Sequence, residues 1–469
     1  MRYSDVSYWL ATAGDLSPRA ALAGDHDFDV VVVGAGYTGL WTAWYLLQRE
    51  PSLRVAICEA EIAGYGASGR NGAWCSAGIG MTAAGLARRY DATTARAVVT
   101  AMRDTVDEVA RACNLAGIDA DYRKGGMLRV ARGAHETTAL RDTTMGLRRL
   151  GLDAGIEELS AGALDRRVRI ASAHGALFDP HCATIHPGHL VRGLATAVEQ
   201  SGAALFERTR VLRILPRGRP AGNGDGHADR PIVQTRHGRI RADTVVVATE
   251  AWTSQLPGHQ RSVLPIYSLI VLTEPLSDAQ WEQIGWQGHE CVSSHRLTVD
   301  YLSRTSDGRI LFGGRGAPYH FGSRVAPQFD RHAATHLELR QTMSDWFPVL
   351  GDTRIAAEWG GPLGMPRDWL PNFRYDPHTG MAGAWGFTGQ GVAASNLAGR
   401  ALTDLMTHRS SPLTVLPMVG HRSRRWEPEP LRWLGARYIQ RAFARIDDRA
   451  ERTGRAPSGR SLAERVMRH

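Results

Sequence analysis

The fold is decided by residues 29–40, which read Asp-Val-Val-Val-Val-Gly-Ala-Gly-Tyr-Thr-Gly-Leu. Four consecutive valines predict a short strand buried on both faces, as in a parallel sheet. The apolar residues 40–47 predict a helix packed on that sheet. Between them, Gly34 makes the tight turn, Gly36 lets a pyrophosphate approach the backbone, and Gly39 lets the helix lie close to the strand. The N-terminus of the helix then faces the phosphates.

A second predicted strand, residues 53–58, ends in Glu59, twenty positions after Gly39. A carboxylate at this place accepts hydrogen bonds from an adenosine ribose and repels a 2′-phosphate, which disfavours NADP. An ordinary βαβ unit with a surface glutamate would show the same pattern. Strand, glycine turn, helix and carboxylate together favour a bound dinucleotide.

Composition limits the other classes of function. The chain has 469 residues, of which 43% are hydrophobic, and no apolar run approaches the length of a membrane span. The first 25 residues lack the apolar segment of a signal peptide, so we expect a cytoplasmic protein. Five scattered cysteines, without C-x-x-C or a histidine cluster, argue against disulfides and a metal site.

The net charge of +9 raises the question of nucleic-acid binding. Most of the surplus lies in residues 419–469, where arginines outnumber acidic residues by about two to one. The remainder of the chain is nearly neutral. We therefore expect no nucleic-acid partner.

A second strand–glycine–helix unit lies near the other end of the chain. Residues 381–385 predict a strand, Phe-Thr-Gly-Gln-Gly-Val at 387–392 a turn, and residues 393–405 a helix. The N-terminus of this helix aims a positive dipole at another electron-rich part of the same ligand. Two such units favour a large cofactor held in the body of the protein.

The predicted fold class is α/β. Residues 28–115, 175–262 and 355–410 form a Rossmann-like dinucleotide-binding domain assembled from discontinuous segments. Residues 116–174 and 263–354 form an α+β substrate domain with a mainly antiparallel sheet, because strands run between the two dinucleotide-type pieces. Residues 411–469 form a basic helical C-terminal tail.

Three blocks, residues 31–59, 66–72 and 386–405, together resemble FAD-dependent oxidoreductases of the D-amino-acid-oxidase-like (glycine oxidase and sarcosine oxidase) family. The strand end Ala248-Thr249 and the turn 359–361 support the resemblance, which runs from about residue 28 to about 410. It implies FAD bound at Gly34, Gly36, Tyr37, Thr38, Gly39, Glu59, Ala60, Ser68, Arg70, Asn71, Gly72, Ala73, Val211, Ala248, Thr249, Trp252, Gly361, Gly389, Gln390, Gly391 and Val392.

The resemblance also implies oxidation of a small amine or amino acid. Hydride leaves the C–H beside nitrogen for flavin N5, and the imine then hydrolyses. The site must hold that carbon, exclude water and keep the amine neutral. Candidates for an aromatic pocket wall are Trp74, Tyr267, Tyr301, Tyr319, Trp359 and Phe387, each of which could equally belong to the core. Arg315 could bind a substrate carboxylate, or lie on the surface.

Three functional hypotheses follow. The first is an amine or amino acid oxidase that uses molecular oxygen. The second is an FAD-dependent amine dehydrogenase that passes electrons to a quinone or protein acceptor. The third is a non-catalytic dinucleotide-binding regulatory protein, which the paired glycine-rich blocks disfavour.

Two departures from the family bear on chemistry. Some relatives place a lysine over the flavin to assist oxygen, whereas the sole lysine here, Lys124, lies away from the FAD blocks. Some relatives tether flavin to a late cysteine, yet none follows Cys291. We therefore expect non-covalent FAD, with Cys75 as the one thiol near a possible attachment loop.

Two features stay open at the level of sequence. His186 either marks the entrance of the helix that begins near Pro187 or has a catalytic role, and the first interpretation is preferred. The predicted helix 431–452 has an apolar stripe that packs on the enzyme body, or else meets a second copy or an anionic surface. The oligomeric state cannot be assigned.

Overall fold

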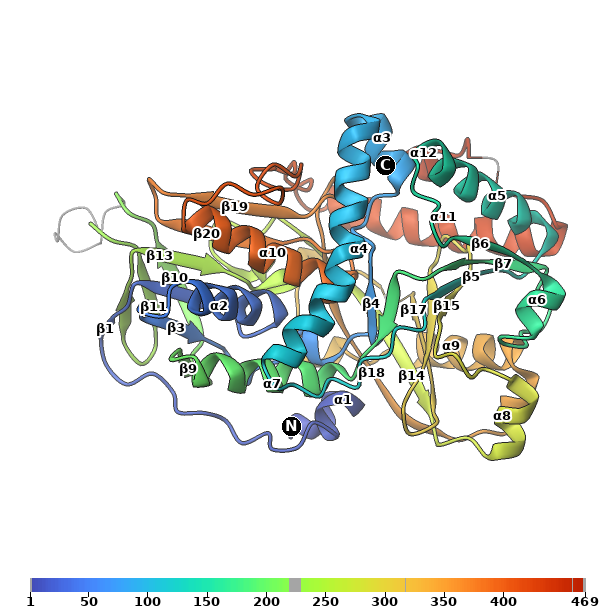
Figure 1. Cartoon of the computed structure of the whole chain (residues 1–469), viewed down its shortest axis with the longest axis horizontal. Helices are drawn as coiled ribbons and strands as arrows, with labels where there is room; N and C mark the ends of the chain where they lie inside the picture. The colour runs from blue at the N-terminus through green and yellow to red at the C-terminus, as the bar shows by residue number, and fades with distance from the viewer. Residues whose placement is uncertain (1, 219–228, 317, 458, 467–469) are drawn as a thin grey trace.

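The computed structural model describes residues 2–218, 229–316, 318–457 and 459–466. It contains two large sheets side by side, with helices on their outer surfaces (Figure 1). The helices are α1 (Tyr8–Ala11), α2 (Tyr37–Arg49), α3 (Ala83–Arg89), α4 (Ala92–Leu115), α5 (Ala134–Arg149), α6 (Ala161–Asp165), α7 (Pro187–Gln200), α8 (Asp278–Ile284), α9 (Ala333–Trp346), α10 (Gly391–Met406), α11 (Leu431–Thr453) and α12 (Leu462–Val466).

The first large sheet is the predicted dinucleotide-type sheet. Its strand order is β19 (Asn372–Asp376), β20 (Met381–Trp385), β13 (Thr244–Val247), β2 (Val30–Val33), β3 (Val55–Cys58) and β9 (Ala204–Phe206). All neighbours are parallel except β19 and β20. The four valines of β2 are all buried, as the apolar run predicted.

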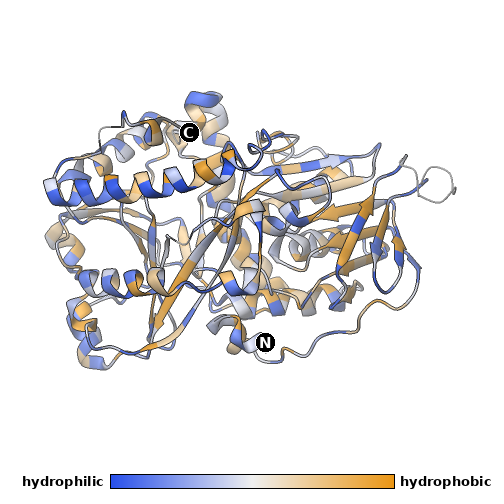
Figure 2. Cartoon of the chain, turned by 180° about the vertical axis from the view of Figure 1, so that it is seen from behind, coloured by the Kyte–Doolittle hydropathy of each residue, from blue (hydrophilic) through white to orange (hydrophobic). Residues whose placement is uncertain are grey.

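Helices cover one face of this sheet and a small sheet covers the other. Apolar side chains of α2, α4, α7 and α10 form one core with Val30 and Val32. Val31 and Val33 face the opposite side, against β11 and β12. That side carries β1 (His26–Asp27), β12 (Arg239–Arg241), β11 (Ile232–Thr235) and β10 (Val211–Leu215). Figure 2 shows apolar residues concentrated along the central strands, with hydrophilic residues on the outer helices.

The second large sheet has eight strands and is mainly antiparallel. Its order is β18 (Ile355–Met365), β14 (Leu264–Thr273), β17 (Ile310–Arg315), β16 (Asp300–Arg304), β15 (Cys291–Ser293), β5 (Met127–Ala131), β7 (Gly175–Asp179) and β6 (Glu157–Ser160). Only β15 and β5 are parallel neighbours. One face packs on α8 and α9 around Trp286, Trp346 and Phe347. A two-stranded ribbon, β4 (Trp74–Ser76) and β8 (Cys182–Thr184), lies between the sheets.

The topology corrects two predicted domain boundaries. Both β7 and β18 belong to the eight-stranded sheet, whereas the sequence analysis assigned residues 175–179 and 355–365 to the dinucleotide-binding domain. The reason is the same in both places. A strand next to a glycine-rich or helical segment carries no local mark of the sheet it will join, because pairing is a long-range choice.

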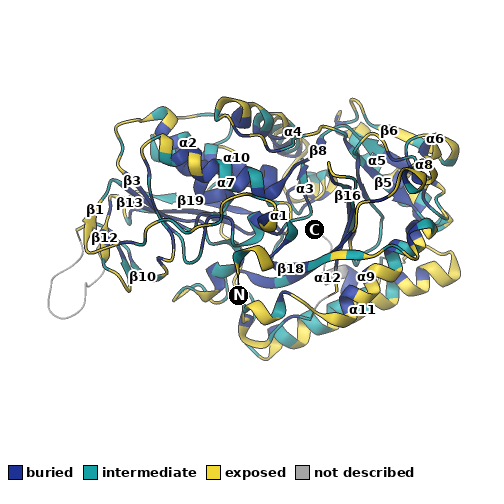
Figure 3. Cartoon of the chain, turned by 90° about the horizontal axis from the view of Figure 1, so that it is seen from below, coloured by how far each residue is buried: buried dark blue, intermediate teal, exposed yellow. Residues whose placement is uncertain are grey.

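The tail forms the predicted long helix, α11, and lies against the enzyme body. Trp433 and Ala436 pack beside Tyr319 and Met365, while Leu434 and Tyr438 remain about half exposed. Figure 3 shows α11 with a largely exposed outer face, unlike the buried α7 and α10. None of the helices in the described ranges combines the length and apolarity needed to cross a bilayer.

Candidate active site

A cavity of about 1080 Å³ opens between the two large sheets. The dinucleotide-type sheet contributes the turns that follow β2, β3, β13 and β20. The eight-stranded sheet contributes the face opposite its helix-covered core, including Ser268, Tyr301 and Gly361. Because it touches both sheets, the cavity can hold a cofactor and a substrate together.

The glycine turn after β2 has the backbone and space that a pyrophosphate needs. Gly34 has φ of +106°, and a Cβ there would lie 2.6 Å from the Ala248 carbonyl oxygen. A Cβ on Gly36 would point toward Ser68 Oγ at 3.1 Å, inside the cavity. Gly39 lies outside the lining, and its Cβ would come within 2.0 Å of the Gly34 carbonyl oxygen. Its role is therefore the close approach of α2 to the turn.

Glu59 sits at the end of β3 and lines the same cavity. Its carboxylate accepts hydrogen bonds from the Ala35 amide at 2.9 Å and the Glu61 amide at 3.0 Å. Desolvation raises the pKa of Glu59 to about 7, against these two bonds. A ligand hydroxyl donating to this carboxylate would favour its charged form.

Most predicted cofactor residues line this one cavity. They are Gly34, Gly36, Tyr37, Thr38, Glu59, Ala60, Ser68, Arg70, Asn71, Gly72, Val211, Ala248, Thr249, Trp252, Gly361, Gly389, Gln390, Gly391 and Val392. Ala73 does not line it; this buried residue has φ of +65°. Ser68 Oγ accepts the Tyr37 amide at 2.8 Å, which fixes the loop to the start of α2.

Arg70 serves a structural contact as well as lining the cavity. Its guanidinium forms a 2.5 Å ion pair with Asp330 and donates to the Tyr65 carbonyl at 2.7 Å. Nη2 is buried without a hydrogen-bond partner among the described residues. Arg70 thus joins the loop after β3 to the other domain and keeps one donor for a ligand.

The second glycine-rich turn leads into α10 as predicted. Thr388 has φ of +58° and Gly389 has φ of +89°, and Gln390 is the N-cap residue. The Gln390 side chain accepts the Gly80 amide at 2.7 Å, so it bridges to the loop before α3. The backbone at 389–392 lines the cavity at the helix N-terminus, where positive potential is greatest.

Glu250 is a cavity residue that sequence analysis missed. It accepts the Gly364 amide at 3.0 Å and the Gly386 amide at 2.8 Å, and thereby ties β18 to β20. Desolvation raises its pKa to about 7. The signal was its position directly after the Ala248-Thr249 strand end, where a residue in the left-handed region (φ +43°) turns into the cavity.

Three of the predicted aromatic walls face the cavity: Trp74, Tyr301 and Phe387. The Trp74 indole donates to the Leu302 carbonyl at 3.0 Å and meets the Tyr301 ring edge-on, 6.2 Å between centroids. The Tyr301 hydroxyl lies 2.9 Å from Ser268 Oγ. These contacts fix the orientation of two aromatic rings on the wall that the substrate would meet.

The structure does not support the other aromatic candidates. Tyr267 points to the opposite face of β14 from its pocket-lining neighbour Ser268, because successive strand residues alternate. Trp359 is core, with its indole donating to the Arg70 carbonyl at 2.9 Å. Tyr319 packs under α11. The backbone of Arg315 ends β17, while its side chain lies outside the described part of the structure.

Three further residues that the sequence analysis discussed are held in structural contacts. Lys124 is ion-paired with Asp107 outside the cavity lining. Cys75 is fully buried, which raises its pKa well above the usual value, and it too lies outside the lining. His186 is the N-cap of α7, accepting the His189 amide at 3.1 Å, and this confirms the interpretation as a helix entrance.

Sequence analysis also missed the polar residues of the far part of the cavity. Arg129 on β5, Ser293 on β15 and His295 beyond it line this part, together with Asp179 on β7. Residues 127–131, Met-Leu-Arg-Val-Ala, carry one charge at an alternating strand position. That charge was the available signal, but its face could be assigned only once the sheet partners were known.

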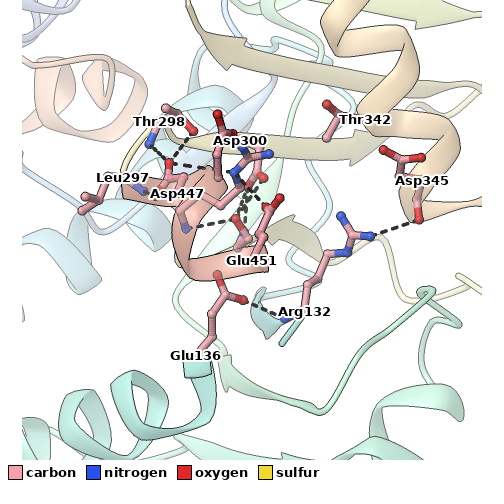
Figure 4. Close-up of polar contacts among 12 residues, drawn as sticks. Arg132, Glu136, Leu297, Thr298, Asp300, Thr342, Asp345, Asp447 and Glu451 are labelled. Atoms are coloured by element: carbon pink, nitrogen blue, oxygen red, sulfur yellow. Dashed lines mark hydrogen bonds and ion pairs between the residues drawn. The ribbon is translucent and has the colours of Figure 1, made fainter. Parts of the chain in front are cut away.

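The tail helix reaches the loop that borders this far part. Asp447 of α11 accepts the amides of Leu297 at 3.0 Å and Thr298 at 2.9 Å, and the Thr298 hydroxyl at 2.8 Å (Figure 4). Arg296 pairs with Asp447 at 3.8 Å and with Glu451 at 3.4 Å. The C-terminal helix therefore holds a loop of the cavity wall in place.

Fold and cavity together define a dinucleotide-binding protein of α/β class. The chain belongs to the FAD dependent oxidoreductase (DAO) family, whose model matches residues 29–405. FAD is therefore the cofactor, and the glycine turns, the free Arg70 donor and the shared cavity fit it. In the described ranges, no cluster of three or more His, Cys, Asp or Glu is placed to hold a metal ion.

Individual relatives agree with this family. The chain is 30% identical over 403 residues to gamma-glutamylputrescine oxidoreductase of Escherichia coli, covering 85% of this chain and 88% of that one. It is 26% identical to glycine oxidase of Geobacillus kaustophilus, covering 84% and 96%. The crystal structure of glycine oxidase from G. kaustophilus superposes with a TM-score of 0.71 at 22% identity, covering 85% of this chain and 100% of that one. This chain thus spans most of each relative and acts as an FAD-dependent oxidoreductase.

Proposed function

We propose that this protein oxidises a small amine or amino acid at the C–H bond beside nitrogen. The observation that carries the proposal is the shared cavity, with glycine turns at one end and an oriented aromatic pair elsewhere on its wall, Trp74 on the β4–β8 ribbon and Tyr301 on the eight-stranded sheet. FAD, when bound, supplies the hydride acceptor. The C–H bond breaks as hydride leaves, the nitrogen lone pair forms C=N and the nitrogen loses a proton, and water later adds to the imine to release a carbonyl compound with ammonia from a primary amine or an amine from a secondary one.

The chain's own residues would perform three tasks. Gly34, Gly36 and Glu59 would hold the adenosine pyrophosphate half of the cofactor, and the 389–392 backbone would contact its ring system. Trp74, Tyr301 and Phe387 would form an apolar wall that excludes water. Such a wall disfavours an ammonium ion, and therefore favours the neutral amine whose lone pair the reaction needs.

The electron acceptor is a separate proposal. We propose molecular oxygen, because so small an acceptor can enter the cavity between the two large sheets without a docking partner. The second candidate is a dehydrogenase with a quinone or protein acceptor. It is favoured by the position of Lys124, the sole lysine, which is paired with Asp107 away from the cavity.

The test is anaerobic bleaching of the bound flavin by a panel of amines and amino acids. Rapid loss of flavin absorbance with at least one amine, and return of colour with air or an artificial acceptor, is the expected result. If the holoenzyme keeps its oxidised spectrum with every primary amine, secondary amine and amino acid tried, the proposal fails. Comparing air with a quinone as reoxidant decides between the two acceptors.

A further inference from the structure

Arg129 is a cation that faces the cavity without a counterion in contact. In the sheet, Arg129 on β5 pairs with Ser293 of β15 on one side and with Leu177 of β7 on the other. Desolvation lowers its pKa, and Asp179 only partly offsets that effect. Among the described residues no hydrogen bond or ion pair reaches its guanidinium. A desolvated guanidinium is costly unless an anion pairs with it.

The acidic groups nearby are engaged elsewhere. Asp179 accepts both the amide and the ring Nδ1 of His181, at 2.9 and 2.7 Å. Asp300 accepts the Ser294 amide and hydroxyl, each at 2.8 Å. Asp142 on α5 also lines the cavity and is exposed. Arg129 thus has donors to offer to a ligand.

A second polar group lies beside it. His295 Nε2 is buried without a hydrogen-bond partner among the described residues. Burial, and then the charge of Arg129, lower the pKa of His295 to about 3, so the ring is neutral near pH 7. A neutral imidazole can donate one N–H. Arg129 and His295 therefore offer donors on the same stretch of cavity wall.

The register of the sheet places these groups away from the aromatic wall. Val292 pairs with Leu302, so Ser293 stands opposite Tyr301, and Ser293 also pairs with Arg129. Tyr301, Ser293 and Arg129 are thus in line on three adjacent strands, all lining the cavity. With strands about 4.8 Å apart, the backbones of Tyr301 and Arg129 are separated by roughly 10 Å.

We propose that Arg129 and His295 form an anion subsite that binds a carboxylate at the far end of the substrate from the oxidised nitrogen. This rests on the proposed function and narrows it to an amine with a chain and a terminal carboxylate. Arg129 offers a planar fork for two carboxylate oxygens, and His295 a single further donor. A carboxylate directly beside the nitrogen would not reach this subsite.

The direct test is calorimetric titration of the holoenzyme with pentanoate, which carries the carboxylate but no amine. Arg129→Gln should weaken binding by about 10- to 100-fold, the range expected for a lost charge-assisted hydrogen-bond pair. Arg129→Lys keeps the positive charge but not the planar fork of the guanidinium, so its affinity for pentanoate should lie between those of the wild type and Arg129→Gln. Arg141→Gln, an exposed arginine on α5 outside the cavity lining, is the matched control and should bind as the wild type does.

Kinetics give the second readout, from 5-aminopentanoate compared with pentylamine. Arg129→Gln should raise KM for the amino acid by a similar factor, with kcat nearly unchanged, and leave pentylamine unaffected. The subsite is refuted if pentanoate does not bind the wild type, or binds Arg129→Gln equally well. If Arg129→Gln loses FAD, the same comparison with Arg129→Lys decides. If no amine bleaches the flavin while pentanoate binding still depends on Arg129, the proposed function fails and the subsite stands.

Discussion

Replacing Asp447 by alanine should loosen the cavity wall from a position on the tail. Asp447 is 4% exposed and accepts three hydrogen bonds from Leu297 and Thr298. Hydrogen bonds to a charged group contribute about 1.5–3 kcal/mol each when intact. Leu297 and Thr298 are only partly buried, so water can replace some of this. We expect a local loss of about 2–4 kcal/mol in the stability of residues 294–300.

Hydrogen exchange measured on peptides covering 294–300 is the assay. A loss of this size raises amide exchange on the order of 30- to 1000-fold, if the loop opens as a local unit. Asp447→Asn keeps one acceptor oxygen and should give an intermediate increase. Asp448→Ala changes an exposed neighbour with no such contacts and is the control. FAD should stay bound in all three variants, because the glycine turns belong to the other sheet.

Unchanged exchange in 294–300 for Asp447→Ala would refute the view that the tail positions this loop. A second consequence links the tail to the substrate. His295 belongs to the same loop, so pentanoate binding should weaken in Asp447→Ala and stay normal in Asp448→Ala. Faster exchange without weaker pentanoate binding would support the role of the tail in positioning the loop, but would show that His295 is not part of the anion subsite.

Three further predictions concern the cofactor region. Gly36→Val should fold but purify without FAD, because the side chain enters the cavity beside Ser68. Gly39→Val should also lower the melting temperature, because its Cβ overlaps the Gly34 carbonyl. Flavin absorbance and thermal melts distinguish the two variants, and a yellow Gly36→Val protein would contradict the assignment of Gly36 to the pyrophosphate. The free energy of unfolding of the wild-type apoprotein should fall, relative to that of Glu250→Gln, by up to about 3 kcal/mol as the pH rises from 4.5 to 7. The folded pKa of about 7 lies above the unfolded value, so the native state binds more protons in this range and loses stability as they leave. If urea unfolding gives the same difference between the two proteins at both pH values, the prediction is wrong. Acid precipitation should release FAD into the supernatant, because Cys75 is buried and outside the cavity lining, and yellow colour left in the pellet would point to a covalent link.

Local sequence predicted the elements that depend on local chemistry. The run Val30–Val33, the turn at Gly34 and the helix predicted at 393–405 each carry local signals of apolar period or backbone freedom, and the structure has them there, with α10 beginning two residues earlier at Gly391. The two misassigned strands, β7 and β18, lacked such signals. Their sheet depends on the partner strands, β5 and β6 for β7 and β14 for β18, which a short sequence window does not contain.

The site divides in the same way. Glycine turns and the carboxylate after β3 act through the backbone near them, so their spacing along the chain was sufficient to place them on one cavity. A residue of the cavity wall depends on the face of the strand to which its side chain points. The next residue along the strand points to the other face, and so into the core. Tyr267 and Ser268 show this directly: neighbours in sequence, they lie on opposite faces of β14.

The same rule explains why substrate recognition was hidden in the sequence and is visible in the structure. Arg129 is far along the chain from Ser293 and Tyr301, and only the register of β16, β15 and β5 aligns the three residues. Once aligned, an arginine that no carboxylate of the described residues contacts becomes an argument about the ligand, because an anion bound in the cavity would supply that partner. The cofactor end of the cavity is thus formed by local sequence motifs that a whole family shares. The substrate end depends on which side chains the sheet brings together, and it is there that one member of the family can differ from the next.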